Sequence, residues 1–162
     1  MNVDQQEAER LVTAYSDLIL RLSCTYLRST QDGEDICQSV LLKLLTGDQV
    51  FDSPAHERAW VVRATINACK DELRAFRRKT VPLEDVPETA APELPRSEVL
   101  DAVMSLPEKY REAIYLFYYE GYSTREIGQL TGRSEAAVSA HLSRGRKKLR
   151  ELLGGSEYER TN

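Results

Sequence analysis

The chain has 162 residues, of which 41% are hydrophobic and 30% charged, and its formal net charge is −4. These values are ordinary for a soluble globular protein with one domain or two small ones, and no run of residues is apolar and long enough to cross a bilayer. The polar, acidic start lacks the cationic and apolar parts of a signal peptide. We therefore expect a cytoplasmic protein without membrane insertion.

The few cysteines and histidines form no pattern of metal ligands. Cys24, Cys37 and Cys69 are far apart without a C-x-x-C pair, and His56 and His141 stand alone. No acid, histidine and nucleophile share a meaningful spacing, and no Gly-rich phosphate loop is present. We expect free thiols, no metal, no cofactor, no catalytic residue and no small-molecule substrate.

Charge alternates along the chain. The net charge is −5 over residues 1–55, +4 over 56–80, −6 over 81–122, +5 over 123–150 and −2 over 151–162. Runs of charge are usually solvated faces, but both basic blocks coincide with candidate helices. They therefore indicate two separate contacts with a polyanion such as DNA.

Three helices are predicted in the first half. Apolar residues recur at helical spacing over 8–27 and again over 33–45, where Asp32 is the expected cap. After a short loop, Ser53 as cap and a proline as first helical residue predict a third helix over 54–79.

Residues 80–96 are predicted to be a linker, because they contain four of the six prolines and four acids without apolar periodicity. The expected organisation is therefore a domain over 1–79, the linker, a second domain over 97–155 and a tail over 156–162. Each domain lies near the lower size limit for an independent core, which makes a partner protein expected.

The second half predicts short helices over 97–105 and 107–120, followed by a helix-turn-helix over 123–150. Ser123 and Glu126 have the spacing of a capping box at its start. The turn and the second helix are marked by Gly128, Gly132, Ser134 and Val138. The second helix of such a unit lies in the DNA major groove. The expected fold class is all-α, with two small helical domains.

Two segments resemble bacterial RNA polymerase sigma factors. The sequence GEDICQSVLLKLL (33–45), followed by ERAWVVRATINACKDELRAFRRK (57–79), is similar to their second conserved region, and residues 106–152 are similar to the fourth. Nothing between them could hold a third folded region. The chain therefore resembles the small extracytoplasmic-function (ECF) group of the sigma-70 family.

The resemblance implies a sigma factor that binds core RNA polymerase and directs promoter-specific initiation, with an anti-sigma factor as a further partner. The second region would grip the clamp helices and open the minus-ten element, and the fourth would hold the flap and read the minus-thirty-five element. Asp35 and Gln38 match the family's E-D-x-x-Q pattern and would face the clamp, whereas Ser39 stands where the family usually has an acid.

The resemblance also places a flipped-out promoter base at the loop 50–57. Asn67, four residues after Arg63, would lie beside it, where an amide can read the base edge as donor and acceptor. Trp60 could stack on melted DNA, but we expect it to be core. The implied minus-ten set is Phe51, Asp52, Ser53, Arg63, Asn67, Lys70, Arg74, Arg77 and Arg78.

In the fourth region the resemblance implies a recognition helix whose start reads bases and whose basic half meets phosphates. Ser139 and His141 stand where the family often has a lysine and an arginine. His141 could donate to a phosphate or be a surface residue without a role. The implied minus-thirty-five set is Ser134, Glu135, Ala136, Ser139, Ala140, Arg144, Arg146, Lys147 and Lys148.

A helix-turn-helix alone is also compatible with a one-component transcriptional regulator that binds its operator unaided. The E-D-x-x-Q and R-A-W…N…D-E-L-R patterns favour the sigma factor. Little in the sequence supports the hypothesis that the protein is an enzyme. Binding to a membrane surface through the cationic helix over 144–150 is also disfavoured, because the apolar face of that helix is too narrow.

Overall fold

The computed structural model describes residues 4–78 and 98–154, and the chain divides into two compact units, residues 1–92 and 93–162. The predicted all-α class is confirmed, since these described residues form helices and no strand. None of the described helices has the length and apolarity needed to span a membrane. The predicted linker and tail lie outside the described ranges, so the domain boundaries stay predictions.

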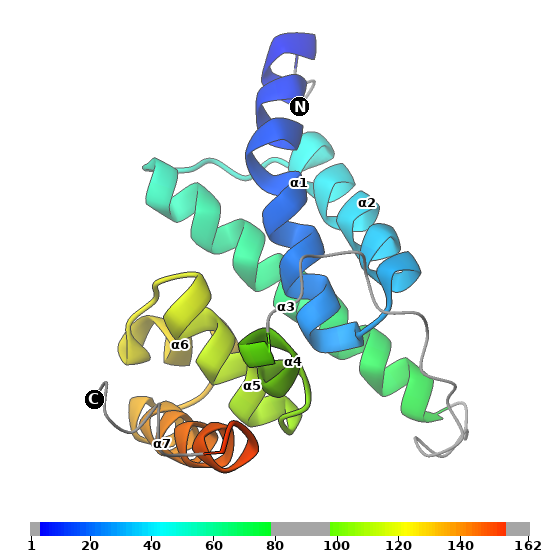
Figure 1. Ribbon diagram of the computed structural model, residues 1–162. Coiled ribbons are helices and arrows are strands. Elements are labelled where there is room, and N and C mark those ends of the chain that lie inside the picture. Colours follow the sequence, from blue (N-terminus) through cyan, green and yellow to red (C-terminus); the bar gives the residue numbers. More distant parts are fainter. Residues whose placement is uncertain (1–3, 79–97, 155–162) are drawn as a thin grey trace. The chain divides into compact units, whose positions relative to one another are not determined.

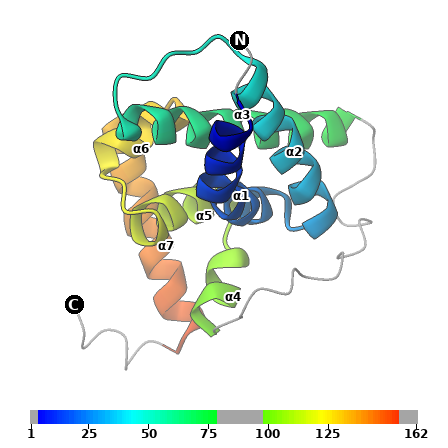
Figure 2. The same cartoon turned by 90° about the horizontal axis from the view of Figure 1, so that it is seen from above.

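Unit 1 contains three helices, α1 (Gln5–Leu27), α2 (Thr30–Thr46) and α3 (Pro54–Arg78). The first two lie side by side and α3 packs across both of them (Figure 1). The connection from α2 to α3 is an open arch (Figure 2). The largest fully buried side chains in the described part of this unit are Ile19, Leu22, Val40, Val61, Val62 and Ile66.

The starts of α1 and α2 differ from the prediction. Asp4 caps α1 by accepting a hydrogen bond from the Glu7 N–H at 2.7 Å, so the helix begins one turn earlier than expected. The prediction that Asp32 caps α2 is wrong, because Ser29 accepts from the Asp32 N–H at 3.3 Å. A left-handed Arg28, with φ of 57°, ends α1 and allows this short connection. Asp32 instead lies in the first turn, where its charge favours the helix dipole.

Unit 2 contains α4 (Glu98–Met104), α5 (Glu108–Ile114), the π-helical segment η2 (Tyr115–Tyr119), α6 (Thr124–Thr131) and α7 (Glu135–Leu152). The helix predicted over 107–120 is therefore real, but its second half widens into a π-helix. The Glu120 N–H bonds to the Tyr115 carbonyl at 3.3 Å, five residues back. Apolar periodicity cannot distinguish this widening from a regular helix.

The helix-turn-helix is confirmed in detail. Ser123 and Glu126 form both bonds of the capping box, at 3.0 and 3.1 Å. Gly132 ends α6 with φ of 73°, a conformation that favours glycine. A Cβ on Gly128 would lie 2.6 Å from the Arg133 carbonyl oxygen, so only glycine fits where the turn passes close to α6.

Candidate nucleic-acid interface

The polar residues predicted on α3 lie along one face of the helix. Their steps of four, three, four and three residues keep them on one side, opposite the buried core. Every one is exposed except Lys70, which is half-buried. We call them the α3 row: Arg63, Asn67, Lys70, Arg74 and Arg77. It extends about 21 Å along the helix. The side chain of Arg78 lies outside the described structure.

The loop before α3 is held by a residue that the sequence reasoning missed. His56 Nδ1 accepts a hydrogen bond from the Asp52 N–H at 3.1 Å, and the His56 N–H donates to Ser53 Oγ at 3.1 Å, which confirms Ser53 as the cap. The Phe51 ring meets the His56 ring edge-on at 5.4 Å between centroids. A histidine three residues after a Ser-Pro cap is the sequence signal that could have identified this contact.

The prediction that Trp60 belongs to the core is wrong. Its side chain is half-buried and meets Phe51 edge-on at 6.0 Å, while Val61 and Val62 are fully buried. Neighbouring helical positions point about 100° apart, so a tryptophan beside two core valines need not share their environment. His56 and Trp60 instead lie on the same face as the α3 row, and with Phe51 they form an aromatic cluster at its start.

A second exposed face lies on α2. Asp35, Gln38, Ser39 and Leu42 recur at helical spacing and are all exposed, with Leu42 61% accessible. The structure therefore brings Asp35 and Gln38 onto one surface, as their spacing predicts. Leu42 extends this surface with an apolar side chain that the sequence reasoning did not single out.

The start of α7 is mostly accessible. Ser134, Glu135, Ala136 and Ser139 are exposed, and Ala140 is half-buried. Ser134 caps the helix by accepting from the Ala137 N–H at 3.1 Å. Glu135 also accepts a hydrogen bond from the Thr124 hydroxyl at 3.1 Å, which ties the start of α7 to the start of α6.

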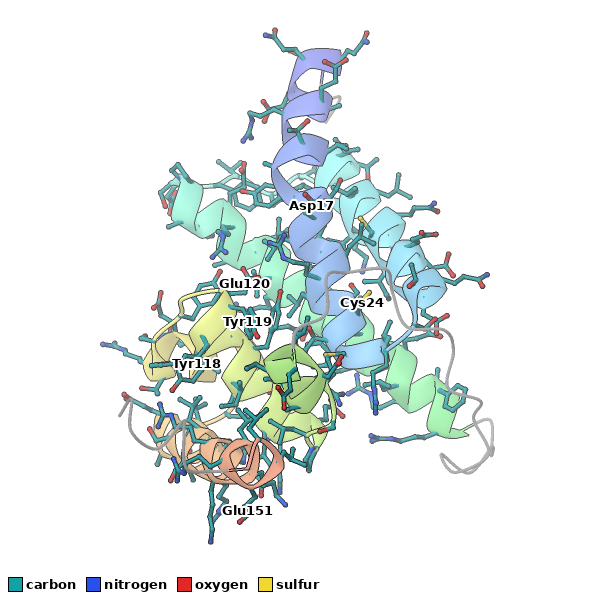
Figure 3. All side chains as sticks on the ribbon, in the orientation of Figure 1. Asp17, Cys24, Tyr118, Tyr119, Glu120 and Glu151 are labelled. Atoms are coloured by element: carbon teal, nitrogen blue, oxygen red, sulfur yellow. The ribbon has the colours of Figure 1, made fainter. Side chains whose placement is uncertain are left out.

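The basic half of α7 presents Arg144, Lys147 and Lys148 to solvent. Arg146 is half-buried, because its Nε donates to the Tyr118 hydroxyl at 2.7 Å and its guanidinium lies 5.7 Å from the Phe117 ring centroid. Tyr118 belongs to η2 and is labelled in Figure 3. The π-helical segment therefore fixes the direction of Arg146, which sequence spacing could not reveal.

Both interpretations of His141 are wrong, because this residue is buried. It lies on the inward face with Val138 and Leu142, its ring meets Tyr110 edge-on at 5.8 Å, and its Nδ1 has no partner among the described residues. Burial, reinforced by the nearby cations Arg133 and Lys109, lowers the pKa of His141 below its usual value. His141 is therefore a neutral core residue rather than a phosphate contact.

The turn between α6 and α7 is anchored to α5. Arg133 Nε donates to Glu112 Oε1 at 3.2 Å, and the Glu112 side chain is only 2% exposed. A buried carboxylate requires such a partner, since an isolated charge in the core is costly. The ion pair therefore helps to set the angle at which α7 leaves the turn.

Comparison with known proteins identifies the same two segments. Residues 11–79 match Sigma-70 region 2, and residues 96–149 match Sigma-70, region 4. The chain is 31% identical to the RNA polymerase sigma factor CarQ of Myxococcus xanthus, covering 96% of this chain and 94% of that protein. It is also 31% identical to the ECF RNA polymerase sigma factor SigM of Mycobacterium tuberculosis, covering 93% and 79%.

Solved structures share this fold. The sigma factor RpoE, in complex with the anti-sigma factor NepR from Bartonella quintana, aligns with a TM-score of 0.73 at 22% identity, over 90% of this chain and 96% of that one. CnrH, in complex with the cytosolic domain of CnrY, aligns with a TM-score of 0.64 at 22% identity, over 94% and 91%.

Proposed function

Because the chain belongs to the ECF group of the sigma-70 family of RNA polymerase sigma factors, we propose that it binds core polymerase and carries promoter specificity on α3 and α7. Sigma factors are not enzymes, and by this proposal the chain has no catalytic site of its own. The chemistry of transcription belongs to the polymerase, whose association with chromosomal DNA makes the cytoplasm the place of action.

The observation that carries the proposal is the placement of the two basic blocks. In a chain of net charge −4, one block supplies the cations of the α3 row and the other supplies those of the basic half of α7. Cationic rows attract the phosphate backbone, while the acidic remainder opposes binding elsewhere. This distribution favours a protein that holds DNA weakly alone and firmly within a larger complex.

For the minus-ten element, we place the extruded base beside Asn67. The amide lies on the same helical face as the aromatic cluster and is flanked by Arg63 and Lys70. An unstacked base can be stacked on an aromatic ring and read along its pairing edge by an amide. By this proposal Trp60 is a stacking surface, and the cations of the α3 row hold the phosphates of the melted strand.

For the minus-thirty-five element, we assign base contacts to the exposed start of α7 and phosphate contacts to its basic half. Phosphate contacts set the position of a protein on the duplex, and base contacts give specificity. Because Glu135 is bonded to Thr124, we assign it to orienting α7 as well as to the groove. Arg146 is directed by Tyr118 and approaches a phosphate from that fixed position.

The protein partners follow from the same assignment. The exposed face of α2, with Asp35, Gln38 and Leu42, is our candidate for the clamp helices, and unit 2 is our candidate for the flap. An anti-sigma factor is a further proposed partner, supported by the similar folds of RpoE and CnrH in complexes with NepR and CnrY.

The alternative function is a one-component regulator, and DNA binding with and without core polymerase distinguishes the two. The probe is a library of labelled duplexes from a bacterial genome, with the free protein, core polymerase or both. A sigma factor should retain specific duplexes only when both are present. Specific retention by the free protein at physiological salt would support the regulator and contradict the proposal.

A further inference from the structure

Three side chains from two helices converge at the start of α3. Glu57, in the first turn of α3, accepts a hydrogen bond from the Tyr15 hydroxyl at 2.6 Å. Arg10 binds the same carboxylate through both terminal nitrogens, at 3.0 and 3.2 Å. These residues lie 42 and 47 positions before Glu57 in the sequence, and both belong to α1. We call the three residues the α1–α3 lock.

The protonation states of the lock are well defined. The bonds from Arg10, followed by the bond from Tyr15, hold the pKa of Glu57 below its usual range. Burial, together with the Glu57 charge, raises the pKa of Tyr15, so its hydroxyl remains a donor at neutral pH. The side chain of Glu57 is only 12% exposed. Its carboxylate is therefore occupied by residues of α1 and unsuited to contact a base, although Glu57 ends the segment predicted to hold one.

Hydrogen bonds connect the first turn of α3, which carries Glu57, to the loop before it. The Glu57 N–H donates to the Ser53 carbonyl at 3.1 Å, and the His56 N–H donates to the Ser53 hydroxyl. His56 in turn accepts from the Asp52 N–H and packs against Phe51. The position of the loop thus depends on the first turn of α3, and that turn is tied to α1 by the side chain of Glu57.

We propose that Glu57 is a positioning residue for minus-ten readout, which fixes the loop 50–53 against α1 through Arg10 and Tyr15. This inference rests on the proposed function, in which that loop and Asn67 read an extruded base. The requirement is geometric, because a base contact depends on a reading surface held within a fraction of an ångström. Specificity at that position would then depend on α1, a helix to which we assign no base contact.

The test weakens the lock from the α1 side and leaves the loop and the α3 row unchanged. Tyr15→Phe removes one hydroxyl and keeps the buried ring. Arg10→Ala removes the ion pair with Glu57, together with the ion pair that Arg10 makes to Glu7 within α1. The Arg10 side chain is 49% exposed, so the substitution leaves the core intact. The matched control is Ser16→Ala, since the Ser16 hydroxyl donates to the Val12 carbonyl within α1 and touches no part of the lock. Each protein is assembled into holoenzyme with purified core polymerase.

The holoenzymes select from a library of random duplexes, and sequencing of the retained DNA gives base preference at each promoter position. The expected result for both lock variants is a loss of preference at one or two adjacent minus-ten positions, by about fivefold or more, since each variant removes at least one hydrogen bond to the Glu57 carboxylate. The loss should persist on templates already mismatched across the element, because a displaced loop also misreads a single-stranded base. Ser16→Ala and the affinity for core polymerase should be unchanged.

The outcomes separate the two claims. A wild-type holoenzyme that selects no minus-ten sequence would overturn the proposed function. A wild type that selects such a sequence, with both lock variants selecting it equally well, would overturn the role of Glu57 alone. Uniform loss at all positions, or equal loss in Ser16→Ala, would assign the lock to general stability and also overturn the inference.

Discussion

Gly128 lies so close to the turn between α6 and α7 that the structure leaves no room for a side chain at this position. A Cβ at this position would lie 2.6 Å from the carbonyl oxygen of Arg133, far inside an ordinary contact, and 3.6 Å from the Glu135 nitrogen. The obstacle is backbone, so it cannot rotate away as a side chain would. The Gly128 carbonyl also accepts hydrogen bonds from the Gly132 and Arg133 N–H groups, which a shifted turn would strain.

We therefore expect Gly128→Ala to destabilise unit 2 in spite of the helix propensity of alanine. Inside a helix, alanine stabilises the folded state by about 1 kcal/mol relative to glycine. Overpacking costs about 1–3 kcal/mol or more, and an obstructing backbone places the cost at the upper end. The net loss should be about 1–2 kcal/mol, which lowers the melting temperature of a unit of this size by about 4–16 °C.

Thermal unfolding of the full chain, followed by circular dichroism, measures this loss, and hydrogen exchange assigns it to unit 2. The matched control is Gly145→Ala in α7, where the added Cβ would meet the side chain of Ile114 at 3.0 Å. That contact is longer than the one at Gly128 and is made by a side chain rather than by backbone, so the control should lose less stability. A Gly128→Ala protein as stable as the wild type would refute the close approach of the turn.

Four further results are expected. Asp35→Ala should weaken binding to core polymerase in a pull-down without changing the helical content, whereas equal binding with a lower melting temperature would reduce Asp35 to a helix-stabilising residue. Lys147→Ala should flatten the logarithmic salt dependence of promoter binding by about 0.9 without changing promoter choice, and a changed choice would make Lys147 a base reader. Asn67→Ala should cost about 1–3 kcal/mol of discrimination at one minus-ten position, and uniform loss with lower stability would make it structural. Burial lowers the pKa of His141, so the imidazole binds a proton more tightly in the unfolded chain than in the folded one, and the stability of the fold should decrease as the pH drops below about 6.5. His141→Phe should flatten this pH dependence in urea titrations, and an unchanged dependence would contradict the buried, neutral state.

Local features were predictable from the sequence. The capping box of Ser123 and Glu126, the left-handed Gly132 and the cap at Ser53 depend on residues within one turn of each other, so their spacing is sufficient to recognise them. The exposed row on α3 was equally accessible, because helical periodicity assigns residues to a face once the helix is known.

Features that depend on packing between separate elements were not predictable. Trp60 adjoins two buried valines in sequence but faces the loop residue Phe51, and His141 is polar but packs against Tyr110 of α5. The bond between Glu57 and Tyr15 joins positions 42 residues apart. Such contacts follow from how helices and loops pack against one another, which the periodicity of a single helix does not contain.

The central claim is that this protein gives core RNA polymerase its choice of promoter. Runoff transcription from a genomic fragment library, with purified core polymerase in the presence and absence of the protein, tests it most directly. We expect a discrete set of transcripts only when the protein is present, with start sites that share two upstream elements. Transcripts that are the same with and without the protein would contradict the claim.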